Sequence, residues 1–149
     1  MDVNTNSTTK AYNFTFTSDD RLKENERYIT NATETLQKLT PQIYDKYLYL
    51  DLSGNPKEES GLVAQDVWYN APELRHLITL GRDYDSSGNE YTPTPDDLDL
   101  SGNDIHTDIS YGEHGWSKTE AACLDYIGLI PYLIKSNQEL EARISELEK

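Results

Sequence analysis

The sequence predicts an α+β fold: a small globular part of short helices and β-hairpins, projecting acidic hairpins and a long C-terminal helix. Three observations lead to this fold class. Strand-like apolar segments alternate with segments of helical pattern, separated by Gly, Pro, Asn and Asp turn signals. Residues 81–115 are acidic and rich in turn residues, which predicts hairpins. Residues 130–147 carry a heptad pattern, which predicts a helix that associates with copies of itself.

The chain is strongly acidic, with 27 Asp and Glu residues against 13 Lys and Arg residues and a formal net charge of -14. This charge repels phosphate backbones and anionic lipid headgroups, so we expect neither nucleic acid nor a membrane as a partner. No apolar run is long enough for a membrane span or a signal peptide, and we expect a soluble, unsecreted protein. With one cysteine, Cys123, and three scattered histidines, we expect no disulfide, metal or other cofactor.

Residues 1–17 differ from the residues that follow. They are mostly uncharged and end in the alternation Tyr12, Phe14, Phe16, which is typical of a short strand. From Ser18 onward the chain is dense in charge, so a boundary between two structural units is predicted at the Thr17–Ser18 bond. We interpret residues 1–17 as the end of an upstream unit and residues 18–149 as the domain itself.

The segments after this boundary predict the elements of the globular part. A helix is expected over residues 31–39, ended by Pro41. The Tyr-rich residues 43–52 predict a strand, followed by turn chemistry at residues 53–56. Residues 61–68 predict the opening of a helix, and residues 74–80 have strand character.

The acidic stretch at residues 81–115 contains two turn signals, at residues 85–89 and 99–103. We expect one or two hairpins here, because long structureless loops are uncommon inside compact domains. Both signals also match the first half of a calcium-binding loop, which leaves calcium as an alternative. The residues concerned are Asp83, Asp85, Ser87 and Gly88 in the first and Asp97, Asp99, Ser101, Gly102 and Asp108 in the second.

The C-terminal residues 117–149 predict a helical region. Ser117 and Glu120 have capping-box spacing, so a helix is expected to open at Ser117, with Gly128 and Pro131 kinking or interrupting it. Beyond Pro131 the heptad predicts oligomerisation, although a helix packed on its own domain is the alternative. The heptad alone does not choose between dimer and trimer. The a and d positions of this seam are Ile130, Leu133, Asn137, Leu140, Ile144 and Leu147.

Ser18 and Lys23 offer a hydroxyl nucleophile and an amine base, as in the Ser–Lys variant of nucleophilic catalysis. A lysine acts as a base only while its amine is neutral, which requires desolvation or nearby cations such as Arg21. Residues five apart do not face one another in a helix or a strand, so the chain must bend between them. A Ser followed by two Asp also fits a helix N-cap, with Lys23 as a solvated charge, and this is the simpler interpretation of these residues alone.

Three blocks of sequence follow in order from Ser18 to the C-terminal helix: residues 18–25 (SDDRLKEN), 61–67 (GLVAQDV) and 124–135 (LDYIGLIPYLIK). Together they resemble the intramolecular chaperone auto-processing domains, a serine-peptidase family at the C-terminal ends of phage tailspikes, endosialidases and other viral fibres. The resemblance implies a homotrimer that guides assembly of the fibre preceding it and then cuts itself off between Thr17 and Ser18. It makes Ser18 the nucleophile and Lys23 the general base.

The resemblance also implies a parallel trimeric coiled coil at the C-terminus and no cofactor. The expected partners are copies of the chain and the upstream fibre of the same polypeptide. A virus-encoded protein made in the host cytoplasm is implied, whose fibre joins the virion while the chaperone domain is released. The matching blocks include residues that we expect to support the site or the fold: Asp19, Arg21, Asn25, Gln65 and Asp66.

Two alternatives remain beside this function. One is a trimerisation and capping module that does not cleave, and the other is a calcium-dependent binding domain at a fibre tip. The stretch at residues 81–115 is longer and more acidic than the family core requires. We expect them to form arms that embrace the fibre during folding.

Overall fold

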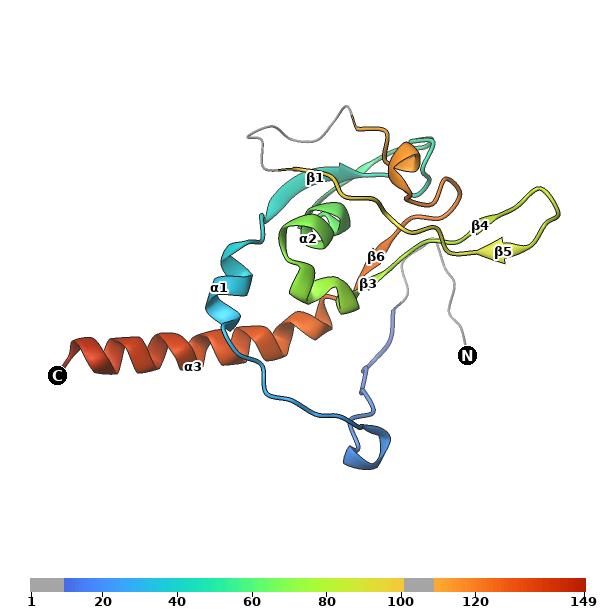
Figure 1. Cartoon of the computed structure of the whole chain (residues 1–149). Coiled ribbons are helices and arrows are strands. Elements are labelled where there is room, and N and C mark those ends of the chain that lie inside the picture. The colour runs from blue at the N-terminus through green and yellow to red at the C-terminus, as the bar shows by residue number, and fades with distance from the viewer. Residues whose placement is uncertain (1–9, 101–108) are drawn as a thin grey trace.

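The computed structural model describes residues 10–100 and 109–149 and confirms a mixed helix and strand architecture (Figure 1). The α-helices are α1 (Ala32–Gln37), α2 (Ala64–Asn70) and α3 (Ile130–Leu147), and 3₁₀ helices lie at Asp20–Leu22, Pro72–Leu77, Tyr111–His114 and Ile127–Leu129. The strands are β1 (Gln42–Lys46), β2 (Lys57–Gly61), β3 (Ile78–Thr79), β4 (Asp83–Tyr84), β5 (Glu90–Tyr91) and β6 (Cys123–Leu124). They form antiparallel pairs β1–β2, β3–β6 and β4–β5.

The core lies around α2 and the 3₁₀ helix that follows it. Pro72 cannot continue α2, so the chain turns there into the 3₁₀ helix Pro72–Leu77. Leu74 is fully buried at this turn, and the rest of the buried cluster surrounds it. The other members of that cluster are Val67, Ala71, Leu77, Ile78 and Leu129.

The pairing of β3 with β6 carries the C-terminal segment back to this core. Asp125 N–H donates to the Leu77 carbonyl at 2.8 Å, and a side chain at Gly128 would collide with that of Leu77. Glycine therefore allows the close approach that starts α3. Pro131 lies in the first turn of α3, where a missing N–H costs no helical hydrogen bond, so it opens the helix and does not kink it.

Several sequence predictions of local structure are confirmed. Helix α1 falls within the predicted residues 31–39, and α2 lies in the predicted helical segment but opens at Ala64, because Gly61 ends β2. The hairpin β4–β5 forms around the predicted turn at residues 85–89, where the Asp85 carboxylate accepts the N–H groups of Ser87 and Asn89. Most of the second predicted turn, at residues 99–103, and the calcium candidates Ser101, Gly102 and Asp108 lie outside the described residues.

Other predictions of local structure are wrong. Residues 12–16 form no strand, because they are exposed and no described strand pairs with them. The strand predicted over residues 43–52 ends at Lys46, where the chain bends toward β2, and β2 is a charged strand that the sequence analysis missed. In residues 74–80 only Ile78–Thr79 is strand, since the 3₁₀ helix begun at Pro72 extends to Leu77.

The helix predicted from Ser117 is also absent. The Ser117 hydroxyl does accept the N–H groups of Thr119 and Glu120, as a helix cap would, but the chain continues into β6. The Asp83 carboxylate accepts the N–H groups of Lys118 and Thr119, so the local capping signal produces a turn and not a helix. Across residues 10–100 and 109–149, no helix is long and apolar enough to cross a membrane.

Candidate functional site

A short turn organises the residues around Ser18. Asp19 is the N-cap of the 3₁₀ helix Asp20–Leu22, and its carboxylate accepts the N–H of Arg21 at 2.9 Å. The Arg21 guanidinium also pairs with Asp19 at 2.7 Å. This hydrogen-bonded pair holds the pKa of Asp19 below its ordinary value. The N–H of Lys23 donates to the Asp20 carbonyl and closes the turn.

The turn brings the side chains of Ser18 and Lys23 together. Lys23 Nζ donates to Ser18 Oγ at 2.7 Å and to the Ser18 carbonyl at 3.0 Å. The bend that a Ser–Lys pair requires between these residues is therefore present. The cap of the turn is Asp19 and not Ser18, so the Ser18 hydroxyl is not used for capping.

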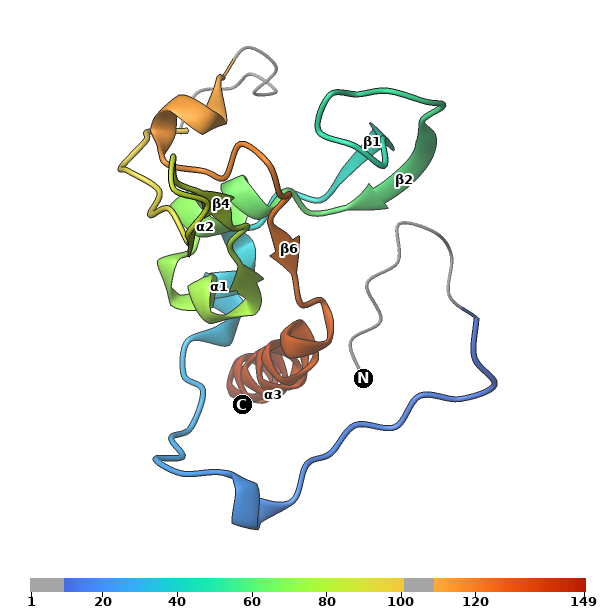
Figure 2. The ribbon, with the colours of Figure 1, turned by 90° about the vertical axis from the view of Figure 1, so that its right-hand side faces the viewer.

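The Ser18–Lys23 pair lies on a long N-terminal arm, which we define as residues 10–28. Every residue of this arm is exposed, and among the described residues its hydrogen bonds stay within the arm. In Figures 1 and 2 the part of the arm around the 3₁₀ helix Asp20–Leu22 lies on the side of α3 that faces away from β1 and β2. The pair is thus formed by local contacts and is uncovered in the single chain.

The other motif residues divide between the arm and the body. Asn25 has a left-handed backbone (φ 57°) and bends the arm just after Lys23. Gln65 and Asp66 lie on α2, which is away from the arm in both views. Asp66 is buried and accepts from the Gln42 amide at 2.9 Å, so it ties α2 to β1. We conclude that Asp66 supports the fold.

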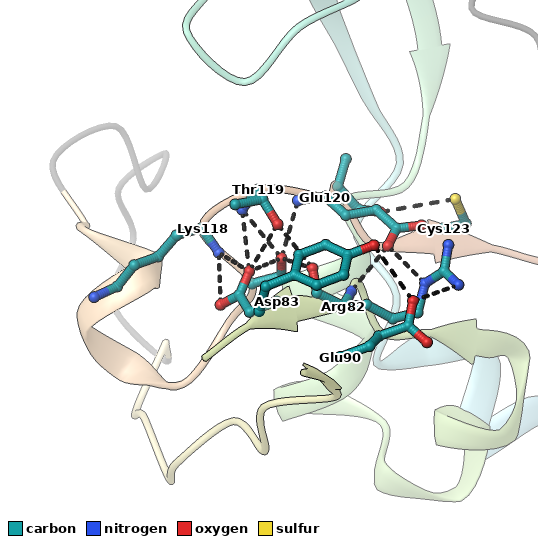
Figure 3. Close-up of polar contacts among 10 residues, drawn as sticks. Arg82, Asp83, Glu90, Lys118, Thr119, Glu120 and Cys123 are labelled. Atoms are coloured by element: carbon teal, nitrogen blue, oxygen red, sulfur yellow. Dashed lines mark hydrogen bonds and ion pairs between the residues drawn. The ribbon is translucent and has the colours of Figure 1, made fainter. Parts of the chain in front are cut away.

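Asp83, proposed above as a calcium ligand, instead holds residues 117–119. Its carboxylate accepts from the Ser117 hydroxyl at 2.6 Å, from the Thr119 hydroxyl at 2.9 Å and from the N–H groups of Lys118 and Thr119 (Figure 3). These bonds, led by that from Ser117, keep the pKa of Asp83 below its ordinary value. In the described part of the chain, no three His, Cys, Asp or Glu side chains gather closely enough to hold a metal ion.

A second group of ionic contacts lies beside Asp83 and completes this junction. Arg82 pairs with Glu120 at 3.1 Å and with Glu90 of β5 at 2.9 Å (Figure 3). We call Asp83, Arg82 and their partners at residues 117–120 the Asp83 junction. Sequence reasoning missed it because its partners are more than 30 residues apart and no local pattern pairs them.

Helix α3 uses one face for its own domain and leaves its heptad seam open. The packed face includes Leu129, Tyr132, Ser136 and Glu139, whose spacing of three or four residues puts them on one side of the helix. The apolar seam residues lie beside that face and remain between 44% and 86% exposed: Ile130, Leu133, Leu140, Ile144 and Leu147. Packing on the domain therefore does not account for the seam.

An apolar groove continues the seam toward the body. Its volume is about 600 Å³, and Leu133 of the seam forms part of its wall. The other apolar lining residues are Leu36, Leu39, Pro41, Leu62 and Leu129. The seam and the groove together form an extended apolar surface next to α1.

Fold and site define a class of protein: a mixed helix and strand domain with a Ser–Lys pair ahead of its body and an open apolar seam on its last helix. Residues 18–76 match the family model Peptidase_S74, described as chaperone of endosialidase. The family resemblance drawn from the sequence is thereby confirmed over these residues, and it supports a chaperone role. No curated protein matches the chain.

Proposed function

We propose that this domain is a homotrimeric intramolecular chaperone of a viral fibre that releases itself by cutting the Thr17–Ser18 bond. The observation that carries the proposal is the 2.7 Å contact between Lys23 Nζ and Ser18 Oγ, formed next to that bond. The match to the chaperone of endosialidase family supports it and begins at residue 18. Residues 1–17 are then the last piece of the fibre.

The chemistry needs no separate substrate pocket, because the nucleophile is joined to its target. Lys23, once neutral, takes the hydroxyl proton as Ser18 Oγ attacks the Thr17 carbonyl carbon. The resulting five-membered ring opens when the Ser18 nitrogen leaves and takes the proton from Lys23, and an ester then links Thr17 to Ser18 Oγ. Water hydrolyses this ester, which gives the Thr17 carboxylate and frees the Ser18 hydroxyl.

In this proposal, trimer assembly supplies the cover over Lys23 that the single chain lacks. Lys23 is exposed and no described residue of the body covers it, whereas a lysine that acts as a base needs desolvation or nearby cations. The exposed seam of α3 favours association with copies of the chain, since large exposed apolar stripes mark interaction surfaces. A parallel trimeric coil would bring three arms near one another, and the adjoining groove adds apolar surface for the contact.

The upstream fibre of the same polypeptide is the proposed client. The hairpin β4–β5 is an arm that could hold the fibre while it folds, as the acidic insertion suggests. After cleavage the fibre would go to the virion and the chaperone domain would be released in the host cytoplasm. Deleting residues 83–108 without loss of trimer assembly would count against a role of this insertion in folding.

Intact mass of the purified full chain tests the cleavage. We expect a fragment that begins at Ser18 from the wild type, and only full-length chain from Ser18→Ala and Lys23→Ala. Arg27→Ala is the matched control, because Arg27 is an exposed base on the same arm, and it should cleave as the wild type does. A trimer, confirmed by native mass, that keeps only its full-length mass would support the non-cleaving trimerisation and capping module instead.

A further inference from the structure

The N-terminus of α1 is capped by a residue from the other end of the chain. Asn31, at the cap position, has a left-handed backbone (φ 53°), and its side chain makes no capping hydrogen bond. Glu139 of α3 replaces it: its carboxylate accepts the N–H of Ala32 at 2.9 Å and that of Thr33 at 3.1 Å. These bonds satisfy donors that a helix leaves free at its start, and the negative charge suits that end of the helix.

The rest of this α1–α3 junction is also polar. The hydroxyl groups of Thr33 and Ser136 are 2.9 Å apart, and both residues are buried. The backbone N–H groups that Glu139 accepts, that of Thr33 first, hold the pKa of this carboxylate below its ordinary value. Hydrogen bonds of fixed direction allow one placement of α1 on α3, whereas an apolar contact tolerates sliding.

Glu139 lies between the heptad seam of α3 and the point where the arm leaves the body. On α3 it lies between Asn137 and Leu140, which are seam positions, but on the neighbouring face that contacts α1. Helix α1 in turn begins just after residues 29–31, which we call the root of the arm. The residue thus connects the helix proposed to form the coil with the point where the arm leaves the body.

We propose that Glu139 is a positioning residue for cleavage, which fixes the root of the arm on the assembled coil. This inference rests on the proposed self-cleavage. Ala32 lies fourteen positions after Ser18, and this stretch could span up to about 50 Å when extended. If the root is free, the arm searches a larger volume, and the Ser18–Lys23 pair meets the assembled surface that would cover it less often.

The test compares two glutamates at equivalent heptad positions in the full chain. Glu139→Ala should cleave at least about tenfold more slowly than the wild type while it remains a trimer by native mass. Glu146→Ala, seven residues further along α3, should cleave at the wild-type rate, because the Glu146 carboxylate pairs with Lys149 on the same helix and not with α1. Glu139→Gln keeps the shape and one acceptor oxygen, and should give an intermediate rate.

A covalent link distinguishes positioning from other effects. In a Cys123→Ser background, Thr33→Cys and Ser136→Cys combined with Glu139→Ala would join α1 to α3 through a disulfide where the hydroxyls now meet. The oxidised protein should recover the wild-type rate, and reduction should slow it again. A slow oxidised protein, an unchanged rate in trimeric Glu139→Ala, or loss of the trimer in that variant would each overturn the role. A wild type that never cleaves would instead contradict the proposed function.

Discussion

The N-terminal arm and the Asp83 junction are both organised by an aspartate that accepts backbone N–H groups, but the contacts differ in sequence separation. On the arm, Asp19 accepts from Arg21, two residues away. In the junction, Asp83 accepts from residues 117–119, which are 34 to 36 residues away. The arm is exposed throughout, whereas Asp83 is only 7% exposed.

The difference in sequence separation indicates that the two sets of contacts have different roles. The local contacts of the arm shape the Ser18–Lys23 turn without help from the body, so the turn can form wherever the arm lies. The distant contacts of the junction form only when the whole domain folds, and they report on its integrity. We infer that the body does not shape the pair, and under the proposed function the assembled trimer would cover it.

The largest expected contrast in stability is between two leucines, one in the body and one on the arm. Leu74 is fully buried, and Leu74→Ala should lower the free energy of unfolding by about 3 kcal/mol through lost burial and a cavity. Leu22 on the arm is 73% exposed, and Leu22→Ala should change it by less than about 0.5 kcal/mol. Urea unfolding followed by tryptophan fluorescence measures both, since Trp68 and Trp116 lie in the body.

Comparable losses for the two variants would show that the arm packs on the body in solution. That result would break the comparison and remove the argument that assembly must cover Lys23. Ser18→Ala, which we expect not to cleave, serves as the common background, so that loss of residues 1–17 does not affect the measurement.

The next largest expected contrast in stability is between Asp83 and Asp19. Asp83→Asn should lower the melting temperature by roughly 5 °C near neutral pH, because the amide cannot accept all the hydrogen bonds that the carboxylate accepts. Asp19→Asn should leave the melting temperature unchanged, since its contacts are confined to the exposed arm. Thermal unfolding followed by circular dichroism measures both.

The pH dependence of the same variants gives a second measurement. The folded-state pKa of Asp83 is lowered, so its contribution to stability is complete above its unfolded-state pKa and is lost as the pH falls through the folded-state pKa. The melting temperature of the wild type should therefore fall more steeply below about pH 4 than that of Asp83→Asn. Equal slopes would mean that the carboxylate of Asp83 adds nothing to the acid sensitivity of the domain.

How much the sequence predicted follows the same division between local and distant contacts. The bend between Ser18 and Lys23 and the hairpin β4–β5 depend on contacts within a few residues, and both were predicted. The two-residue strand β6 and the true start of α3 depend on pairing with β3 and on the approach of Gly128 to Leu77. No local pattern around Ser117 contains that information.

Two missed features show why local signals mislead. Asn31 has the chemistry of a helix cap, yet its left-handed backbone leaves α1 to be capped by Glu139, more than 100 residues away. Strand β2 is charged, without the apolar alternation of a half-buried strand, and forms because β1 pairs with it in the register Ile43 to Ser60. In both cases a partner that is distant in the sequence determines the local structure, and the sequence of the segment does not indicate that partner.

The smallest expected effect on stability is that of Asp19→Ala, although Asp19 should matter most to the structure of the arm. Asp19→Ala removes both the cap of the 3₁₀ turn and the pair with Arg21, so Lys23 should spend less time beside Ser18. We expect cleavage to slow by about tenfold while the melting temperature stays within about 1 °C of the wild type. Asp20→Ala, one residue further along the same turn, is the control and should cleave normally. Intact mass over time measures the rate, and normal cleavage by Asp19→Ala would show that assembly, not the local turn, brings Ser18 and Lys23 together.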